Sequence, residues 1–221
     1  MQVSETDSFI EEVTEEVRRD RLFQLFRRYG WIAAAAVLLL VGGAAFREYR
    51  LAQQRVAAEA VGDGIMTAVR QADLGIRAET LAELPATRDA AAIVGLLTAG
   101  TDLEAGEPAR AVAQLEALAA DPDLAPRYRH LAVLQRLMIL APDMPAQDRI
   151  AELAAVASPG APYRLLAEEQ IAIAEAELGM SDVAIERLGR ILEDQELTAG
   201  LRRRVADLIV ALGGAPGETD R

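Results

Sequence analysis

Few side chains in this sequence have the type and spacing that chemistry requires. The only histidine, His130, lies in a basic run that starts at Arg127, and acids stand close together at Glu168-Glu169 and at Glu175 and Glu177. The absence of cysteine excludes thiol nucleophiles and zinc–thiolate sites, so a metal would need mostly carboxylate ligands. We therefore expect His130 to be structural or solvent-exposed, and the acids to lie on a solvated helix face.

The glycine-rich stretches do not fit a phosphate site. Gly42-Gly43 and Gly62-Asp63-Gly64 follow no predicted strand, and the chain has no lysine to contact a phosphate. The Gly-x-Ser-x-Gly turn of hydrolases is absent as well. The sequence therefore predicts no catalytic, cofactor-binding or metal-binding residues, and we do not expect an enzyme.

An uncharged run near the N-terminus, residues 29–46, has the sequence YGWIAAAAVLLLVGGAAF. As a helix it would cover about 27 Å, the thickness of a bilayer core. A cleaved signal peptide is one alternative, but the preceding segment is acidic where a signal peptide is basic. A buried core helix is another, but a run with no polar face suits lipid better. We predict a transmembrane helix at 29–46.

The arginines on either side of this helix indicate its orientation. Five arginines precede the run and three follow it closely, at Arg47, Arg50 and Arg55. Because the more basic side of a membrane helix faces the cytoplasm, we expect a single-pass type II protein with a cytoplasmic N-terminus. The bulk of the chain would then lie outside the cytoplasm.

Residues 1–28 form an arm with the pattern of an amphipathic helix. Ser8 and Glu11 have the spacing of a capping box, and Phe9, Val13 and Val17 recur every four residues. Such a helix could lie on the membrane surface. The acids of the arm would repel anionic headgroups, which keeps open a second interpretation, a cytosolic docking segment.

The charge balance bears on partners. The net charge is −12, and the arm contributes five arginines against seven acids, which leaves −10 for residues 47–221. Such an acidic surface repels nucleic acid, so we expect no nucleic-acid binding. All basic residues are arginines, which we interpret as the coding bias of a GC-rich bacterium.

Beyond the predicted span the apolar spacing is helical almost throughout, so the sequence predicts an all-α fold. Residues 47–85 are expected to be linker helices: one to about Val61, a hinge at Gly62-Asp63-Gly64, and a second helix from about Ile65 to Leu84, stopped by Pro85. Residues 86–221 are expected to form the main domain.

The main domain repeats with a period of about 36 residues. One apolar spacing recurs in three helices, as Ala111, Leu115, Leu118 and Ala119, then Ala146, Ile150, Leu153 and Ala154, then Ala184, Leu188, Ile191 and Leu192. The preceding helices align as Ala99, Leu134 and Ala172, and as Leu103, Met138 and Ala176, with turns at Gly106, Ala141 and Gly179. Three helical hairpins with a capping helix at 198–212 are typical of an α-solenoid.

The period and the small-residue columns resemble tetratricopeptide repeats. Together with the arm from Phe9 to Arg21 and the runs Leu103–Ala111 and Leu178–Ala184, the chain resembles an alphaproteobacterial branch of a bacterial inner-membrane family. Its tetratricopeptide-like domain is shared with the ancillary subunit of the Sec translocon and with a cell-division coordinator. The resemblance implies a bacterial inner-membrane protein with a periplasmic repeat domain, which holds or hands on newly exported chains near the translocon.

We therefore expect a membrane-tethered protein-interaction module, an adaptor or chaperone for exported proteins. The candidate protein-binding residues are Tyr128, Arg129, Tyr163 and Arg164, because aromatics are scarce in this chain and arginine is favoured at interfaces. A scaffold for cell division or envelope assembly is one alternative. A structural homo-oligomer, formed through the acidic domain or the alanine-rich span, is another.

Overall fold

The computed structural model describes residues 4–215, with the backbone alone for residues 4–27, 29, 30, 33 and 34. Every regular element in this range is an α-helix, so the predicted all-α class is confirmed. The chain divides into two compact units, Met1–Ala58 and Glu59–Arg221. Each unit is described by itself below.

The described part of the first unit, residues 4–58, is a single helix. Helix α1 (Ser4–Val69) runs through it and ends in the second unit. The apolar residues from Val37 to Val41 are all exposed. Within the described side chains, no helix is both long and apolar enough to cross a membrane. The predicted span includes Tyr29, Gly30, Ala33 and Ala34, and the predicted arm comprises residues 1–28; apart from Arg28, their side chains lie outside the described residues.

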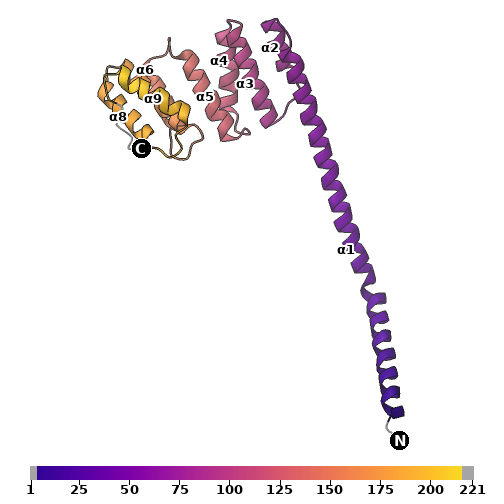
Figure 1. Ribbon diagram of the computed structural model, residues 1–221. Helices are drawn as coiled ribbons and strands as arrows, with labels where there is room; N and C mark the ends of the chain where they lie inside the picture. The colour runs from indigo at the N-terminus through magenta and orange to yellow at the C-terminus, as the bar shows by residue number, and fades with distance from the viewer. Residues whose placement is uncertain (1–3, 216–221) are drawn as a thin grey trace. The chain divides into compact units, whose positions relative to one another are not determined.

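The second unit contains the end of α1 and eight further helices within the described residues. These are α2 (Leu74–Ala82), α3 (Asp89–Glu104), α4 (Pro108–Ala120), α5 (Pro126–Leu140), α6 (Ala146–Val156), α7 (Arg164–Glu177), α8 (Ser181–Leu192) and α9 (Ala199–Ala211). From α2 to α9, each helix packs against the next one in sequence, and Figure 1 shows α3, α4 and α5 side by side. The helix pairs α3–α4, α5–α6 and α7–α8 and the final helix lie where the repeat predicts them.

The core of this unit lies in successive clusters, each built from three consecutive helices. The first joins α3, α4 and α5 around Leu115 and Ala132. The second joins α5, α6 and α7 around Leu137 and Leu153. The third joins α7, α8 and α9 around Leu188. Small residues such as Ala132 bring the helices close together, and leucines fill the space between them.

The turns of the outer hairpins follow from their glycines. Gly106 and Gly179 have φ values of +79° and +77°, a conformation that side-chain-bearing residues rarely adopt. After Gly106, the amide of Glu107 bonds to the carbonyl of Asp102 at 2.8 Å, which closes the end of α3. Pro108 then opens α4 at a position where its missing N–H costs nothing. The predicted turn residues are confirmed at both glycines.

The predicted hinge at Gly62-Asp63-Gly64 is wrong, because α1 continues through it to Val69. An ideal Cβ on Gly64 would overlap the end of the Leu84 side chain, so this glycine permits close packing. The break falls instead at residues 70–73, where Asp73 caps α2 by accepting a hydrogen bond of 2.9 Å from the amide of Ile76. The Arg77 guanidinium donates to the Gln71 carbonyl at 2.8 Å and holds this turn.

Candidate protein-binding groove

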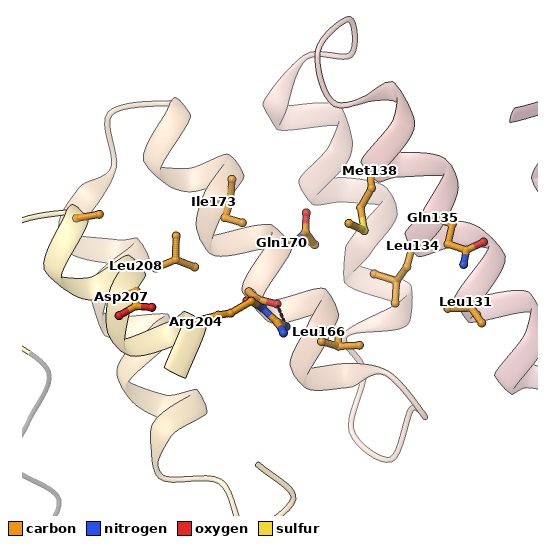
Figure 2. A pocket seen from close by; sticks show the side chains of 12 residues that line it. Leu131, Leu134, Gln135, Met138, Leu166, Gln170, Ile173, Arg204, Asp207 and Leu208 are labelled. Carbon is orange, nitrogen blue, oxygen red and sulfur yellow. Dashed lines mark hydrogen bonds and ion pairs between the residues drawn. The ribbon is translucent and has the colours of Figure 1, made fainter. Parts of the chain in front are cut away.

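A cavity of about 790 Å³ lies between α5, α7 and α9. Each helix lines it with the same four positions, i, i+3, i+4 and i+7: Leu131 to Met138 on α5, Leu166 to Ile173 on α7 and Arg204 to Ala211 on α9. Positions with this spacing share one helix face, so three helices present one face each to the cavity. Figure 2 shows the lining side chains on the three helices.

Two smaller cavities adjoin this one. The first, about 230 Å³, is lined on α3 by the same four positions, Leu96 to Leu103, and shares Gln135 and Met138 with the large cavity. The second, about 320 Å³, shares Ile173 and Leu208 with it. We call the three cavities together the groove. It runs across the first helix of each pair and across the final helix.

The groove is mainly apolar. Leu96, Leu131 and Leu166 occupy equivalent positions on α3, α5 and α7, and Met138 and Ile173 form part of a second apolar row. The Met138 side chain is 57% exposed, although it stands among apolar neighbours. A contiguous, accessible apolar surface on a protein marks an interaction site, and methionine adapts its shape to different partners.

An ion pair crosses the wall of the groove. The Arg204 guanidinium of α9 donates two hydrogen bonds of 2.8 Å to the two carboxylate oxygens of Glu169 on α7. Glu169 is buried, and its hydrogen bonds to Arg204 raise the pKa of the arginine despite the opposing effect of burial. Because the bidentate pair satisfies both oxygens, it fixes α9 against α7.

Two further acids of α7 also form ion pairs. The expectation of a solvated acidic face is wrong for Glu169 and Glu175, which are buried, whereas Glu177 is exposed. Glu175 is buried and accepts two hydrogen bonds from Arg187 of α8, at 2.6 and 3.0 Å. These bonds raise the pKa of Arg187. Glu177 pairs with the buried Arg149 of α6. The acids therefore tie α7 to the helices on both sides.

The two predicted binding-site tyrosines pack against the core. Tyr128, in the first turn of α5, is half-buried against the cluster of α3 and α4, and the Arg127 guanidinium lies 4.7 Å from the centre of its ring. Tyr163, just before α7, packs against the cluster of α5 and α6. The two rings thus belong to different clusters, and neither lines the groove.

The two predicted arginines are also placed away from the groove lining. Arg164 pairs with Glu168 one turn later at 3.3 Å and with Asp194 in the segment between α8 and α9. The hydrogen bond to Asp194 raises the pKa of Arg164 and lowers that of Asp194. Arg129 is half-buried, and its Nε atom has no hydrogen-bond partner among the described residues.

His130 stands in the first turn of α5 and is half-buried, and its buried Nδ1 atom accepts or donates no hydrogen bond within the described part of the chain. No ion pair joins His130 to a carboxylate among residues 4–215 whose side chains are described. Among the described residues, no three histidine, aspartate or glutamate side chains are close enough to hold a metal ion.

The groove could have been found in the sequence by a different alignment. The sequence alignment matched Leu134 of α5 with Ala172 of α7, which lies 38 residues further on. This is the spacing of the second helices of the last two pairs, where Ala146 and Ala184 are also 38 residues apart. On the groove face the position equivalent to Leu134 is Glu169, 35 residues on. Ala172 lies instead in the core cluster shared with α8. The recurrence of glutamine at Gln135 and Gln170 was the available signal.

Comparison with protein-family models, with curated proteins and with solved structures finds no match for this chain.

Proposed function

We propose that this chain is a membrane-anchored protein-interaction module whose groove binds apolar segments of partner proteins. The observation that carries the proposal is the continuity of the groove across α3, α5, α7 and α9, each of which offers the same four positions. We take the successive helix pairs to be a tetratricopeptide-like α-solenoid, in which such a surface serves as a peptide-binding site.

The anchor in this proposal is the run 29–46, inserted in the bacterial inner membrane with the N-terminus in the cytoplasm. Its described apolar side chains support this role, since Leu38, Leu39 and Leu40 are 73%, 78% and 74% exposed. Lipid would remove this surface from water. The arginine bias across the run favours a periplasmic second unit.

The partners we propose are newly exported chains and the Sec translocon that delivers them. Exported chains expose apolar segments before they fold, and an apolar groove is suited to hold such segments. Anchoring in the same membrane raises the effective concentration of a weak binding site beside its substrates. The module would then act as an adaptor or chaperone and not as an enzyme.

The test is site-specific photo-crosslinking in intact cells that carry the full-length chain. The crosslinker replaces Met138, which is exposed and shared by two cavities of the groove. The control position is Glu116, which is exposed on α4 and outside the groove lining. We expect varied exported chains and translocon subunits to be crosslinked from position 138 and not from position 116.

Other results would redirect or end the proposal. A single stoichiometric division or envelope protein captured from position 138 would replace the client-binding role with that of a scaffold. Capture of a second copy of this chain alone would favour a homo-oligomer. Equal yields from positions 138 and 116 would mean that the groove is not the binding site.

A further inference from the structure

We propose that the groove binds its partner as an extended chain, with Gln135 and Gln170 bonding the partner's backbone and Asp207 facing a basic residue of the partner. This inference rests on the proposed function, because it specifies the chemistry of the occupant of the same groove. The occupant is a segment of another protein that is apolar, extended and positively charged.

The two glutamines occupy the same place on neighbouring helices. Gln135 on α5 and Gln170 on α7 are 35 residues apart, and each is the third of the four lining positions of its helix. Both are half-buried among apolar lining residues such as Met138 and Ile173. Neither amide makes a hydrogen bond to the described part of the chain. Figure 2 shows them on the two adjoining helices.

These free amides discriminate between a helical and an extended occupant. A partner that covers the groove removes water from both glutamines and must replace the lost hydrogen bonds. A helix has already used its backbone N–H and C=O groups internally, whereas an extended segment presents them along its length. Each glutamine amide offers two N–H donors and one carbonyl acceptor, so it matches a peptide unit whatever the side chains are.

The charges of the groove favour a cationic partner. Of its lining acids, Glu169 is paired with Arg204, and Glu177 is paired with Arg149. Asp207 is exposed and forms no ion pair with the described part of the chain. Arg203 stands one turn before Asp207 on α9 but does not line the groove. The uncompensated lining charge is therefore negative, as is the net charge of −12 of the whole chain.

The experiment measures peptide binding to the full-length chain in lipid nanodiscs by fluorescence anisotropy, with empty nanodiscs as the blank. The parent probe is a labelled peptide of about nine residues, rich in valine and threonine so that it stays extended, with a lysine at each end. One variant carries glutamates at the ends. Another has N-methylated backbone amides, which removes its N–H donors. A helix-forming peptide of alanine and leucine has the same lysine ends.

We expect the parent peptide to bind about tenfold more tightly than the N-methylated one. In the Gln135→Ala/Gln170→Ala variant this ratio should fall to about one, because the groove can no longer form hydrogen bonds to the peptide backbone through these side chains. The control Gln147→Ala, on the exposed start of α6, should keep the ratio. A merely apolar groove would bind the parent as well or better after the change to alanine.

We expect the lysine-ended peptide to bind several-fold more tightly than the glutamate-ended one at low salt. Asp207→Asn should reduce this preference, whereas Asp123→Asn, the same change in the exposed turn before α5, should not. The inference is overturned if N-methylation has no effect, if the helical peptide binds more tightly, or if charge makes no difference. Peptide binding with any of those results, together with crosslinking at position 138, would leave the proposed function standing. Absence of both binding and crosslinking would end both proposals.

Discussion

The two units of this protein differ in how far their leucine side chains are exposed to solvent. In the first unit Leu39 and its neighbours are exposed on a single helix. In the second unit Leu115 and Leu188 are each 1% exposed, because other helices pack over them. A helix that is apolar all round has no interior of its own, so its burial depends on what surrounds it. Sequence hydrophobicity alone therefore predicts burial only where a partner helix exists.

The change from exposed to buried apolar side chains occurs within one helix. Along α1, Val56 is exposed, whereas Val61 and Ala68 are buried. This change coincides with the boundary between the units, after Ala58. The side chains of α1 that are described in the first unit are thus mostly exposed, whereas in the second unit Val61 and Ala68 belong to the core.

The largest effect is expected from a charge in the exposed run. Leu39→Arg should cost about 3–4 kcal/mol of insertion free energy, because arginine is strongly disfavoured at the centre of a membrane helix. The fraction of the protein that resists alkaline carbonate extraction should fall sharply, while Leu39→Val should leave it unchanged. Retention of the arginine variant would contradict the proposed anchor.

The next prediction compares a leucine-to-alanine substitution in each of the two units. Leu188→Ala should lower the free energy of unfolding by about 3 kcal/mol, because it leaves a cavity between α7, α8 and α9. Leu40→Ala, in the exposed run, should leave the unfolding of the second unit unchanged. Urea titrations followed by circular dichroism measure both. Equal destabilisation by the two variants would erase the distinction between the units.

Two glycines of α1 lie just beyond the boundary between the units and differ in their surroundings. Gly62 has no neighbouring atom within 4 Å of an added Cβ, so Gly62→Ala should stabilise the helix by up to about 1 kcal/mol. Gly64→Ala should gain less, because its methyl group must displace the end of the Leu84 side chain. Thermal unfolding of the two variants gives the difference. A larger gain at position 64 would count against the packing role of that glycine.

The smallest effect concerns the acid stability of the second unit. The hydrogen bond from Arg164 lowers the pKa of Asp194 below its ordinary value of 3.8, so the folded state holds the ionised form. Its contribution to stability is present above that value and is lost as the pH falls through the lower, folded-state pKa. Asp194→Asn should therefore flatten the acid limb of the stability profile, measured from urea midpoints between neutral pH and about pH 3. An unchanged acid limb in the Asp194→Asn variant would contradict this role of the ion pair.

The sequence predicted the helices well and the groove poorly. Helix positions follow from local signals, such as the glycines at 106 and 179 and the proline at 108, which act through their own backbones. The predicted hinge is wrong. The prediction used the fact that glycine weakens an isolated helix, whereas Gly64 lies where the Leu84 side chain packs closely against α1. Local propensity could not report that contact.

The predicted binding residues illustrate a second limit. Tyr128 and Arg164 have the side chains that interfaces favour, yet the structure uses them for packing and for an ion pair within the chain. The groove is lined largely by leucine, methionine and glutamine, which on a sequence look like ordinary helix residues. Whether an apolar face is covered by the next helix or left open depends on tertiary packing, which periodicity does not contain.

The core clusters have a consequence for how the second unit responds to a bound partner. Helix α5 contributes Ala132 to one cluster and Leu137 to the next, and α7 likewise contributes Ile171 to one and Ala172 to the other. Cooperativity between neighbouring clusters therefore passes through these two helices, which also form the centre of the groove. A ligand seated there would couple the local unfolding of all three clusters, and amide hydrogen exchange would slow far from the residues it touches.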